Sequence, residues 1–275
     1  MRLREKNRMI KNQIKIIIHL ICACLLVGIT TIASAETVLI TGSNSGIGLE
    51  FAKQYAAKGW QVIATHRRDT TPESLQKLAA KYRNVRVEQM DVSNRDQINQ
   101  LATKLQGTAI DVLINNAGLV MLGALDFQNN SQSFGTLNYD HFDTMMATNV
   151  KGPMLVTEAF IGHVRAGKLK KIIAISSMSA MVSVPPANGG MYWYGMSKAA
   201  LNKLMVTLAA DLKKEGVTVV MFHPGFVKVE KMAGFDFPGM IETTVAVGNM
   251  IKTIDGLTIS DTGKFMQNDG APQPW

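Results

Sequence analysis

Two residues four positions apart, Tyr194 and Lys198, could carry out a proton transfer. On a helix this spacing places both side chains on one face, whereas Tyr192, six residues before Lys198, would point elsewhere. A phenol is a proton donor, and several serines in the stretch that begins at Ser176 could assist it. Local spacing alone does not choose among these serines.

A glycine-rich turn, TGSNSGIG, lies between an apolar run and a segment with helical spacing. Such a turn lets the chain bend tightly and lets its backbone approach a pyrophosphate, which the N-terminus of the following helix attracts. Glycines at this spacing also occur in ordinary turns, so the placement between strand and helix carries the prediction. The expected cofactor-binding residues are Gly42, Ser43, Asn44, Ser45, Gly46, Ile47 and Gly48.

The end of the second apolar run bears on the choice of cofactor. NAD sites place an acid about 20 residues past the glycines, on the ribose 2′-hydroxyl. Here Thr65 and His66 are followed by Arg67 and Arg68, with no acid before Asp69. Arginine suits a 2′-phosphate, so NADP(H) is favoured over NAD(H), and Arg67 is the residue expected to bind that phosphate. The alternative is that the arginines are solvated surface, above all Arg68.

Further polar positions end the third and fourth apolar runs. Asp91 ends the third, and the segment Asn115, Asn116, Ala117, Gly118 ends the fourth. We expect Asp91, Asn115, Ala117 and Gly118 to border the adenosine half of the site. The alternatives are a helix cap for Asp91 and a simple turn for the second segment.

The elements that must position these residues alternate along the chain from residue 37. Alternation of this kind predicts a single α/β domain with a doubly wound parallel sheet of about seven strands and helices on both faces. Sites on such sheets lie at the carboxyl ends of the strands. The expected strands are 37–41, 61–65, 85–89, 111–115, 171–176, 217–222 and 263–266, and the expected helices are 47–58, 72–82, 95–105, 140–163, 193–214 and 241–252.

Residues 1–35 differ from the rest of the chain. Six of the cations lie there against one acid, which accounts for most of the net charge of +8 and argues against a nucleic-acid-binding stripe. The uncharged run Ile16–Ala35 ends on Ala33-Ser34-Ala35, a cleavage pattern of an export signal. An uncleaved membrane anchor is the alternative, and a buried core helix is disfavoured. Both main interpretations place the domain 36–275 outside the cytoplasm.

Both cysteines, Cys22 and Cys24, lie in this segment. The domain 36–275 is therefore expected to have no disulfide, no thiol nucleophile and no cysteine-ligated metal, and we predict no metal site.

Taken together, the motifs resemble those of the short-chain dehydrogenases/reductases over residues 37–275. The resemblance rests on TGSNSGIG, NNAG, the NVKG that begins at Asn149, ISS at 175–177, YGMSK at 194–198 and PG at 224–225. Within that family, HPGFVKVEKMAG, DGL, TGKF and the C-terminal Pro-Trp look like the sniffer and C-factor-type carbonyl reductases. The family implies a Rossmann-like fold and a nicotinamide cofactor.

The resemblance also implies catalytic roles. Tyr194 would be the general acid, and Lys198 would lower its pKa from about 10 and hold the nicotinamide ribose. A serine would orient the carbonyl and stabilise the developing oxyanion. Asn149 would hold a water that relays protons to Lys198, the alternative being an ordinary polar residue of a helix.

The family pattern selects Ser177, with Ala180 three residues later, and leaves Ser179 as the second choice. Ser176 should point to the other side of the strand, because successive strand residues alternate faces. The extra length before Tyr194 lies in the segment 184–190, VPPANGG, which can form a loop. Tyr192 is expected to be a pocket wall or a core aromatic.

The family's PG loop would bind the nicotinamide through Pro224, Gly225 and Val227. A threonine often follows PGxVx in the family, but Val229 stands there in this sequence. The nicotinamide carboxamide would then depend on the backbone at 226–227, which puts cofactor affinity rather than chemistry in doubt.

The resulting prediction is an NADP(H)-dependent oxidoreductase acting on a small-molecule carbonyl or alcohol, with NAD less favoured. The alternatives are a non-catalytic NAD(P)-binding redox sensor or scaffold and an exported structural protein without cofactor. The segment 231–243 should cover the substrate pocket, and its Met and Phe residues suggest an apolar substrate. The family also implies a homodimer or homotetramer, through helices 140–163 and 193–214.

Overall fold

The computed structural model of the protein describes residues 35–120, 134–184, 190–230, 234 and 238–275, together with residues 1, 2, 4, 5, 9 and 15. The chain divides into two units, Met1–Ser34 and Ala35–Trp275, of which the second holds all the elements below. The apolar run expected at 16–35 lies, except for its last residue, outside the described residues, as do both cysteines. Among the helices that the structure describes, none is both long and apolar enough to cross a membrane.

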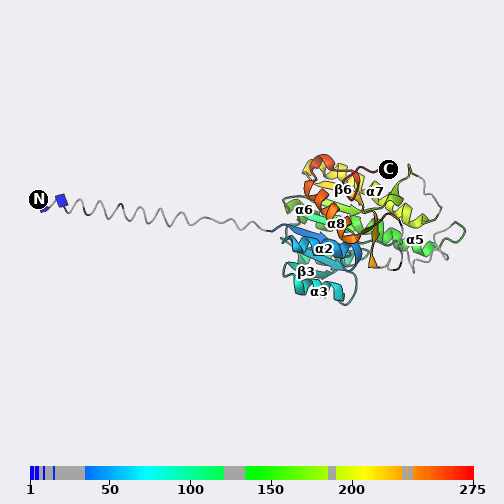
Figure 1. Ribbon diagram of the computed structural model, residues 1–275, viewed down its shortest axis with the longest axis horizontal. Coiled ribbons are helices and arrows are strands. Elements are labelled where there is room, and N and C mark those ends of the chain that lie inside the picture. Colours follow the sequence, from blue (N-terminus) through cyan, green and yellow to red (C-terminus); the bar gives the residue numbers. More distant parts are fainter. Residues whose placement is uncertain are drawn as a thin grey trace. The chain divides into compact units, whose positions relative to one another are not determined.

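Seven parallel strands form one sheet in the order β3-β2-β1-β4-β5-β6-β9 (Figure 1). The central strands are buried along their whole length, as the continuous Val and Ile runs predict for a sheet covered on both faces. This confirms the predicted doubly wound sheet. The strands are β1 (Thr37–Ile40), β2 (Gln61–His66), β3 (Val85–Gln89), β4 (Val112–Asn115), β5 (Lys171–Ile175), β6 (Thr218–His223) and β9 (Phe265–Gln267).

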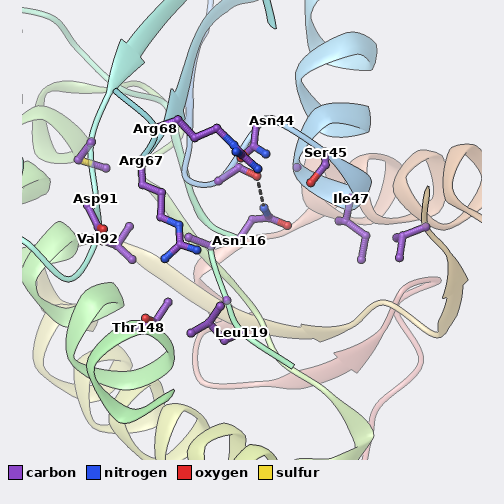
Figure 2. A pocket seen from close by; sticks show the side chains of 16 residues that line it. Asn44, Ser45, Ile47, Arg67, Arg68, Asp91, Val92, Asn116, Leu119 and Thr148 are labelled. Atoms are coloured by element: carbon purple, nitrogen blue, oxygen red, sulfur yellow. Dashed lines mark hydrogen bonds between the residues drawn. The ribbon is translucent and has the colours of Figure 1, made fainter. Parts of the chain in front are cut away.

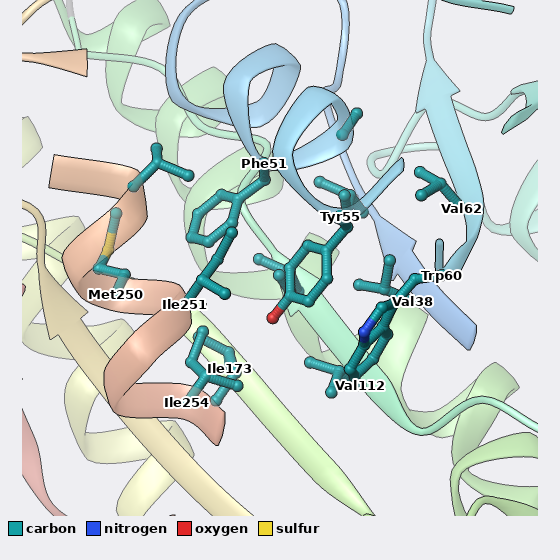
Figure 3. Close-up of a cluster of buried hydrophobic side chains, with 14 of the residues drawn as sticks. Val38, Phe51, Tyr55, Trp60, Val62, Val112, Ile173, Met250, Ile251 and Ile254 are labelled. Carbon is teal, nitrogen blue, oxygen red and sulfur yellow. The ribbon is translucent and has the colours of Figure 1, made fainter. Parts of the chain in front are cut away.

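Helices cover both faces of this sheet. One face packs on α2 (Gly46–Ala57), α3 (Glu73–Lys81) and α8 (Thr243–Gly256). Figure 3 shows this core, where the Tyr55 ring lies between Phe51 and Trp60. The opposite face packs on α4 (Arg95–Lys104), α6 (Gly152–Ala166) and α7 (Tyr192–Leu212). Because all seven strands are parallel, their carboxyl ends lie together at one end of the sheet, between the two cores.

Two of the expected helices differ from the structure. The helix expected at 140–163 is interrupted: α5 (Tyr139–Met146) leads into a π-helical turn, Ala147–Lys151, before α6 begins. The helix expected from residue 241 begins at Thr243, because Met240–Glu242 forms strand β8 and pairs with β7 (Phe226–Lys228). This small second sheet joins segments too far apart in sequence for local periodicity to reveal it.

Candidate active site

The glycine-rich turn adopts a backbone shape that requires glycine. Gly42 and Gly46 have φ angles of 67° and 54°, in the left-handed region. A Cβ atom on Gly48 would lie 2.3 Å from the carbonyl oxygen of Gly42, so this glycine allows α2 to pack against the turn. The three glycines therefore serve the turn and the packing that the sequence predicts.

Hydrogen bonds tie this turn to the segment after β4. The Thr41 hydroxyl accepts bonds from the backbone N–H groups of Asn116 (3.0 Å) and Ala117 (2.9 Å). The Asn116 amide donates to the carbonyl oxygens of Thr41 (2.9 Å) and Gly42 (3.1 Å), and Figure 2 shows it lying beneath the turn. Asn116 is thus a structural link between two parts of the site that the sequence treats as separate motifs.

A cavity of about 270 Å³ opens at this edge of the sheet (Figure 2). Arg67 and Arg68, which follow β2, both line it, and both side chains are exposed. Asp91 lines it too, while accepting hydrogen bonds from the backbone and hydroxyl of Ser93. Its remaining lining comes from Gly42, Asn44, Ser45, Ile47, Gly48, Met90, Val92, Asn116, Ala117, Gly118, Leu119, Thr148 and Val229.

The N-terminus of α2 already binds one carboxylate. Ser45, the residue before the helix, makes no capping hydrogen bond with its side chain. Instead the backbone N–H of Gly46 donates to Oε2 of Glu230 at 2.9 Å. A helix N-terminus favours anions, and here the anion comes from the loop after β7. Nothing in the local sequence marks Glu230 as a site residue, because 184 residues separate it from Gly46.

Two expected cofactor residues point away from this cavity. The Ser43 hydroxyl donates to the carbonyl oxygen of Ile40, and the side chain is fully buried. The Asn115 amide donates to the Thr157 hydroxyl of α6 at 3.3 Å. Neither residue lines the cavity. Both hold the strand ends in place, and Asn116 takes the position facing the turn.

Tyr194 and Ser177 meet at the carboxyl end of β5. Both side chains are buried, and Ser177 hydrogen-bonds the Tyr194 hydroxyl. Burial raises the pKa of the Tyr194 phenol, and the Ser177 bond acts in the opposite direction. The pKa is therefore raised in the protein alone, not lowered as we expected from Lys198, because desolvation is the larger effect.

Lys198 lies one helical turn from Tyr194 and is itself buried. Its ammonium donates to the carbonyl oxygen of Ile175 at 2.8 Å and lies 5.8 Å from the centre of the Tyr194 ring. Burial lowers the pKa of Lys198 to about 8. The predicted pairing on one helix face is confirmed. Burial brings the pKa of Lys198 toward the physiological range but moves that of Tyr194 away from it.

Asn149 lies in the π-helical turn between α5 and α6, and turns of this kind are frequent at functional sites. Its Oδ1 accepts from the Leu119 N–H and its Nδ2 donates to the Leu119 carbonyl oxygen, both at 2.8 Å. The same Nδ2 donates to Ser197 Oγ at 3.0 Å. A Cβ atom on Gly118 would lie 3.4 Å from Asn149 Oδ1 and 3.5 Å from Lys198 Nζ. Asn149 therefore joins the segment after β4 to α7, beside Lys198.

The other serine and tyrosine candidates between Ser176 and Lys198 make different contacts. The Ser176 hydroxyl donates to Asn202 Oδ1 at 2.6 Å, so Ser176 and Ser177 both contact α7, and the predicted placement on opposite sides does not separate the two serines. Ser179 is exposed, and its backbone N–H donates to Ser177 Oγ at 3.1 Å. Tyr192 begins α7 with 43% of its surface exposed, so it is not a core aromatic. Most of the loop between Ser177 and Tyr192 that was expected at 184–190 lies outside the described residues.

The PG loop after β6 is held by a hydrogen bond from the segment after β9. The Asn268 amide donates to the carbonyl oxygen of Pro224 at 3.0 Å. Gly225 has a φ of 91°, and a Cβ atom there would lie 2.8 Å from Ile241. Val227 is buried in β7. Only part of the cover segment expected at 231–243 is described, and its last residues form β8 and the start of α8.

Residues 36–236 match the protein family described as short chain dehydrogenase. Among curated relatives, the C-signal protein of Myxococcus xanthus is 33% identical over 174 residues, which cover 63% of this chain and 98% of the relative.

Two solved structures have the same fold. The NADPH-bound carbonyl reductase from chicken fatty liver is 27% identical, with a TM-score of 0.78, and the match covers 88% of this chain and 99% of that one. The carbonyl reductase Sniffer of D. melanogaster is 26% identical, with a TM-score of 0.76 and coverage of 88% and 100%. These matches confirm the resemblance to sniffer- and C-factor-type proteins.

Proposed function

The chain belongs to the short-chain dehydrogenase/reductase family and is an oxidoreductase, and from this premise we propose that it is an NADP(H)-dependent carbonyl reductase. The observation that carries the proposal is the buried group of Ser177, Tyr194 and Lys198 at the carboxyl end of β5. It lies at the edge of the sheet where the glycine turn and the arginine-lined cavity also lie.

The residues of the cavity fit a nicotinamide dinucleotide. The N-terminus of α2 binds an anion, the Glu230 carboxylate. A pyrophosphate is also an anion that a helix N-terminus favours. Arg67 and Arg68 supply guanidinium donors suited to a further phosphate. When bound, the cofactor supplies the hydride. The glycine turn would hold its phosphates, and Lys198 its nicotinamide ribose.

The preference for NADP(H) depends on the arginines after β2. A charge-assisted hydrogen bond contributes about 1.5–3 kcal/mol, so Arg67→Met should lower the NADPH-over-NADH ratio of kcat/KM by about 10- to 100-fold. Arg68→Met is the matched comparison, because both side chains line the cavity. Equal, unchanged ratios in both variants would show that the 2′-phosphate is recognised elsewhere.

In the proposed reaction Tyr194 donates its phenolic proton to the carbonyl oxygen as the carbonyl carbon accepts the hydride. The product is an alcohol, and Tyr194 is left as a phenolate. Ser177 stands within hydrogen-bonding distance of that phenol, so its hydroxyl is placed to orient the same carbonyl oxygen and to stabilise its developing charge.

Lys198 and Asn149 support this step. The Lys198 ammonium stabilises the phenolate electrostatically. The Asn149 side chain uses its amide to bind Leu119 and Ser197, so we assign it a positioning role toward Lys198 and α7. A water relay through Asn149 would have to use its backbone or a rearranged side chain.

The direct test is oxidation of NADPH and NADH by the purified protein against a panel of aldehydes and ketones. Carbonyl-dependent oxidation of NADPH supports the proposal. Tight NADPH binding without turnover of any carbonyl would instead favour the redox sensor or scaffold, and absence of NADPH binding would favour an exported structural protein.

We further propose that residues 1–35 direct export of the domain, with residues 1–35 removed or retained as an anchor. The basic start and the Ala33-Ser34-Ala35 ending motivate this. Mass spectrometry of the native protein should find Glu36 at the N-terminus if the segment is cleaved. A soluble cytoplasmic form that begins at Met1 would contradict export.

A homodimer or homotetramer formed through α6 and α7 is also proposed. Met196, in the first turns of α7, keeps 42% of its surface exposed. Sedimentation should find a dimer or larger species at micromolar concentration, and a monomer there would overturn this.

A further inference from the structure

A second pocket, of about 360 Å³, lies at the carboxyl ends of β6 and β9. Its volume falls within the range of about 300–1,000 Å³ that is usual for small-molecule sites. It shares no lining residue with the nucleotide cavity. Its lining consists of Met178, His223, Gly225, Phe226, Gly239, Ile241, Val245, Asn249, Gln267, Asn268 and Gln273.

Two polar side chains of this pocket lie side by side. His223 of β6 is the Cα partner of Gln267 of β9, and paired residues of neighbouring strands point to the same face. His223 is 8% exposed, and its Nδ1 is buried without a hydrogen-bond partner in the described part of the chain. The Gln267 carboxamide likewise has none there. Buried polar groups are usually satisfied, so the unpaired His223 nitrogen needs an explanation, whereas Gln267 is only half-buried.

The imidazole of His223 is neutral at physiological pH, because burial lowers its pKa to about 4. A neutral imidazole offers one donor and one acceptor. The hydrogen bond made by one ring nitrogen decides whether the other nitrogen carries the proton. No described protein group fixes this choice for His223. A ligand in the pocket can therefore set the tautomer and orientation of the ring.

The remaining lining limits the ligand. Asn249 donates to Asn268 Oδ1 (3.1 Å), and Asn268 donates to the Pro224 carbonyl oxygen (3.0 Å), so these amides hold each other and the PG loop. Apolar side chains supply further lining, among them Ile241 and Val245, and none of the lining residues is charged. A ligand that fits is uncharged, with an apolar body and a group that both donates and accepts hydrogen bonds.

The pocket adjoins the proposed reaction centre. Met178, which lines it, directly follows Ser177. The Ser176 N–H donates to the Phe222 carbonyl oxygen at 2.7 Å, which continues the β5–β6 register and places Ser176 beside His223. Neighbouring strands lie about 4.8 Å apart, so a substrate tail about the length of one aromatic ring is the one to test.

We propose that this pocket binds the tail of the carbonyl substrate and that His223 and Gln267 select a tail ending in a carboxamide-like group. The inference rests on the proposed function and specifies its substrate class: uncharged aldehydes or ketones that carry a hydrogen-bonding amide one ring away from the reacting carbonyl. His223 and Gln267 are specificity-determining residues in this account and take no part in the proton transfer.

The catalytic test compares 4-formylbenzamide with 4-isopropylbenzaldehyde, whose isopropyl group has the shape of the amide without its hydrogen bonds. The quantity to follow is the ratio of their kcat/KM values in each variant relative to wild type, since intrinsic reactivity then cancels. His223→Phe and Gln267→Leu should each lower this ratio about 3- to 10-fold, the value of one neutral hydrogen bond. Gln106→Leu, on an exposed turn, should leave it unchanged. Ratios within twofold of wild type in both pocket variants would overturn the proposal.

A binding test does not need turnover. Benzamide added at millimolar concentration to the wild-type protein should shift the imidazole ¹⁵N signals of His223, which are assigned by their absence in His223→Phe, and the shift should saturate. If benzamide shifts these signals while neither aldehyde is reduced, the proposed function fails and the pocket stands. If benzamide leaves them unshifted, the substrate-tail pocket is excluded, whatever the enzyme reduces.

Discussion

The glycine turn and the pocket beside β9 lie at the same edge of the sheet, but their polar groups are bonded differently. At the turn, Thr41 accepts two backbone N–H groups and Asn116 donates to two carbonyl oxygens. In the pocket, His223 and Gln267 lack partners among the described residues. The bonded groups hold the shape of the turn, whereas the unbonded pair is where we propose that a ligand binds.

The reaction centre resembles the turn in this respect. Lys198 is bonded to Ile175, Asn149 to Leu119 and Ser197, and Ser177 to Tyr194. Changes to such bonded groups should reduce turnover strongly, while changes to the unbonded pair should alter substrate choice and acid stability. The predictions below test this division.

The largest effect is expected from Tyr194→Phe, which removes the acidic hydroxyl and keeps the buried ring. General acid catalysis contributes about 10²- to 10⁴-fold, so kcat should fall by that much while NADPH affinity, measured by fluorescence titration, stays the same. Tyr192→Phe is the matched control and should change kcat less than twofold, because Tyr192 keeps 43% of its surface exposed. The assignment is wrong if the two variants exchange these outcomes.

Ser177→Ala should have the next largest effect. It removes the hydroxyl that bonds the Tyr194 phenol and that we place on the developing oxyanion. Loss of one such donor costs about 10²- to 10³-fold in kcat. Ser179→Ala provides the comparison, since that side chain is exposed and only its backbone contacts Ser177. A full loss in Ser179→Ala with Ser177→Ala active would reverse the choice of serine.

His223 should make the fold sensitive to acid. Its pKa of about 4 lies below the unfolded value of about 6.5, so between these values the unfolded chain binds the additional proton. Stability is therefore lost as pH falls from 6.5 to 4, by about 2–3 kcal/mol from this residue. Urea unfolding of wild type and His223→Phe across this range should show a shallower pH dependence in the variant. Parallel curves would mean that His223 titrates normally.

Glu230→Gln should give the smallest effect, and in the opposite direction. The Glu230 carboxylate occupies the N-terminus of α2, where the cofactor phosphates are proposed to bind. A neutral amide can still accept the Gly46 N–H but does not repel phosphates, so NADPH should bind about 3- to 10-fold more tightly. The gain should shrink at high salt. Weaker binding in the variant would mean instead that the carboxylate helps to close the site.

The sequence predicts the local features of this molecule well. The seven strands follow from continuous apolar runs, and the glycine turn and the Tyr194–Lys198 spacing are features of single elements. Long-range contacts were not predictable in this way. Glu230 reaches Gly46 across 184 residues, β7 pairs with β8, and His223 meets Gln267 only through the strand order. The raised pKa of Tyr194 was also missed, because burial depends on the whole core and not on the neighbouring lysine.

The most direct test of the account follows the hydride itself. The purified protein is incubated with NADPH deuterated at the transferable C4 position and with an aldehyde that it reduces, and the alcohol is analysed by NMR. The account predicts one deuterium on the carbinol carbon of the wild-type product, and loss of at least 99% of this product in Tyr194→Phe at unchanged NADPH binding, which follows from a contribution of about 10²-fold or more. An alcohol without deuterium, or equal deuterium transfer by Tyr194→Phe, would contradict it.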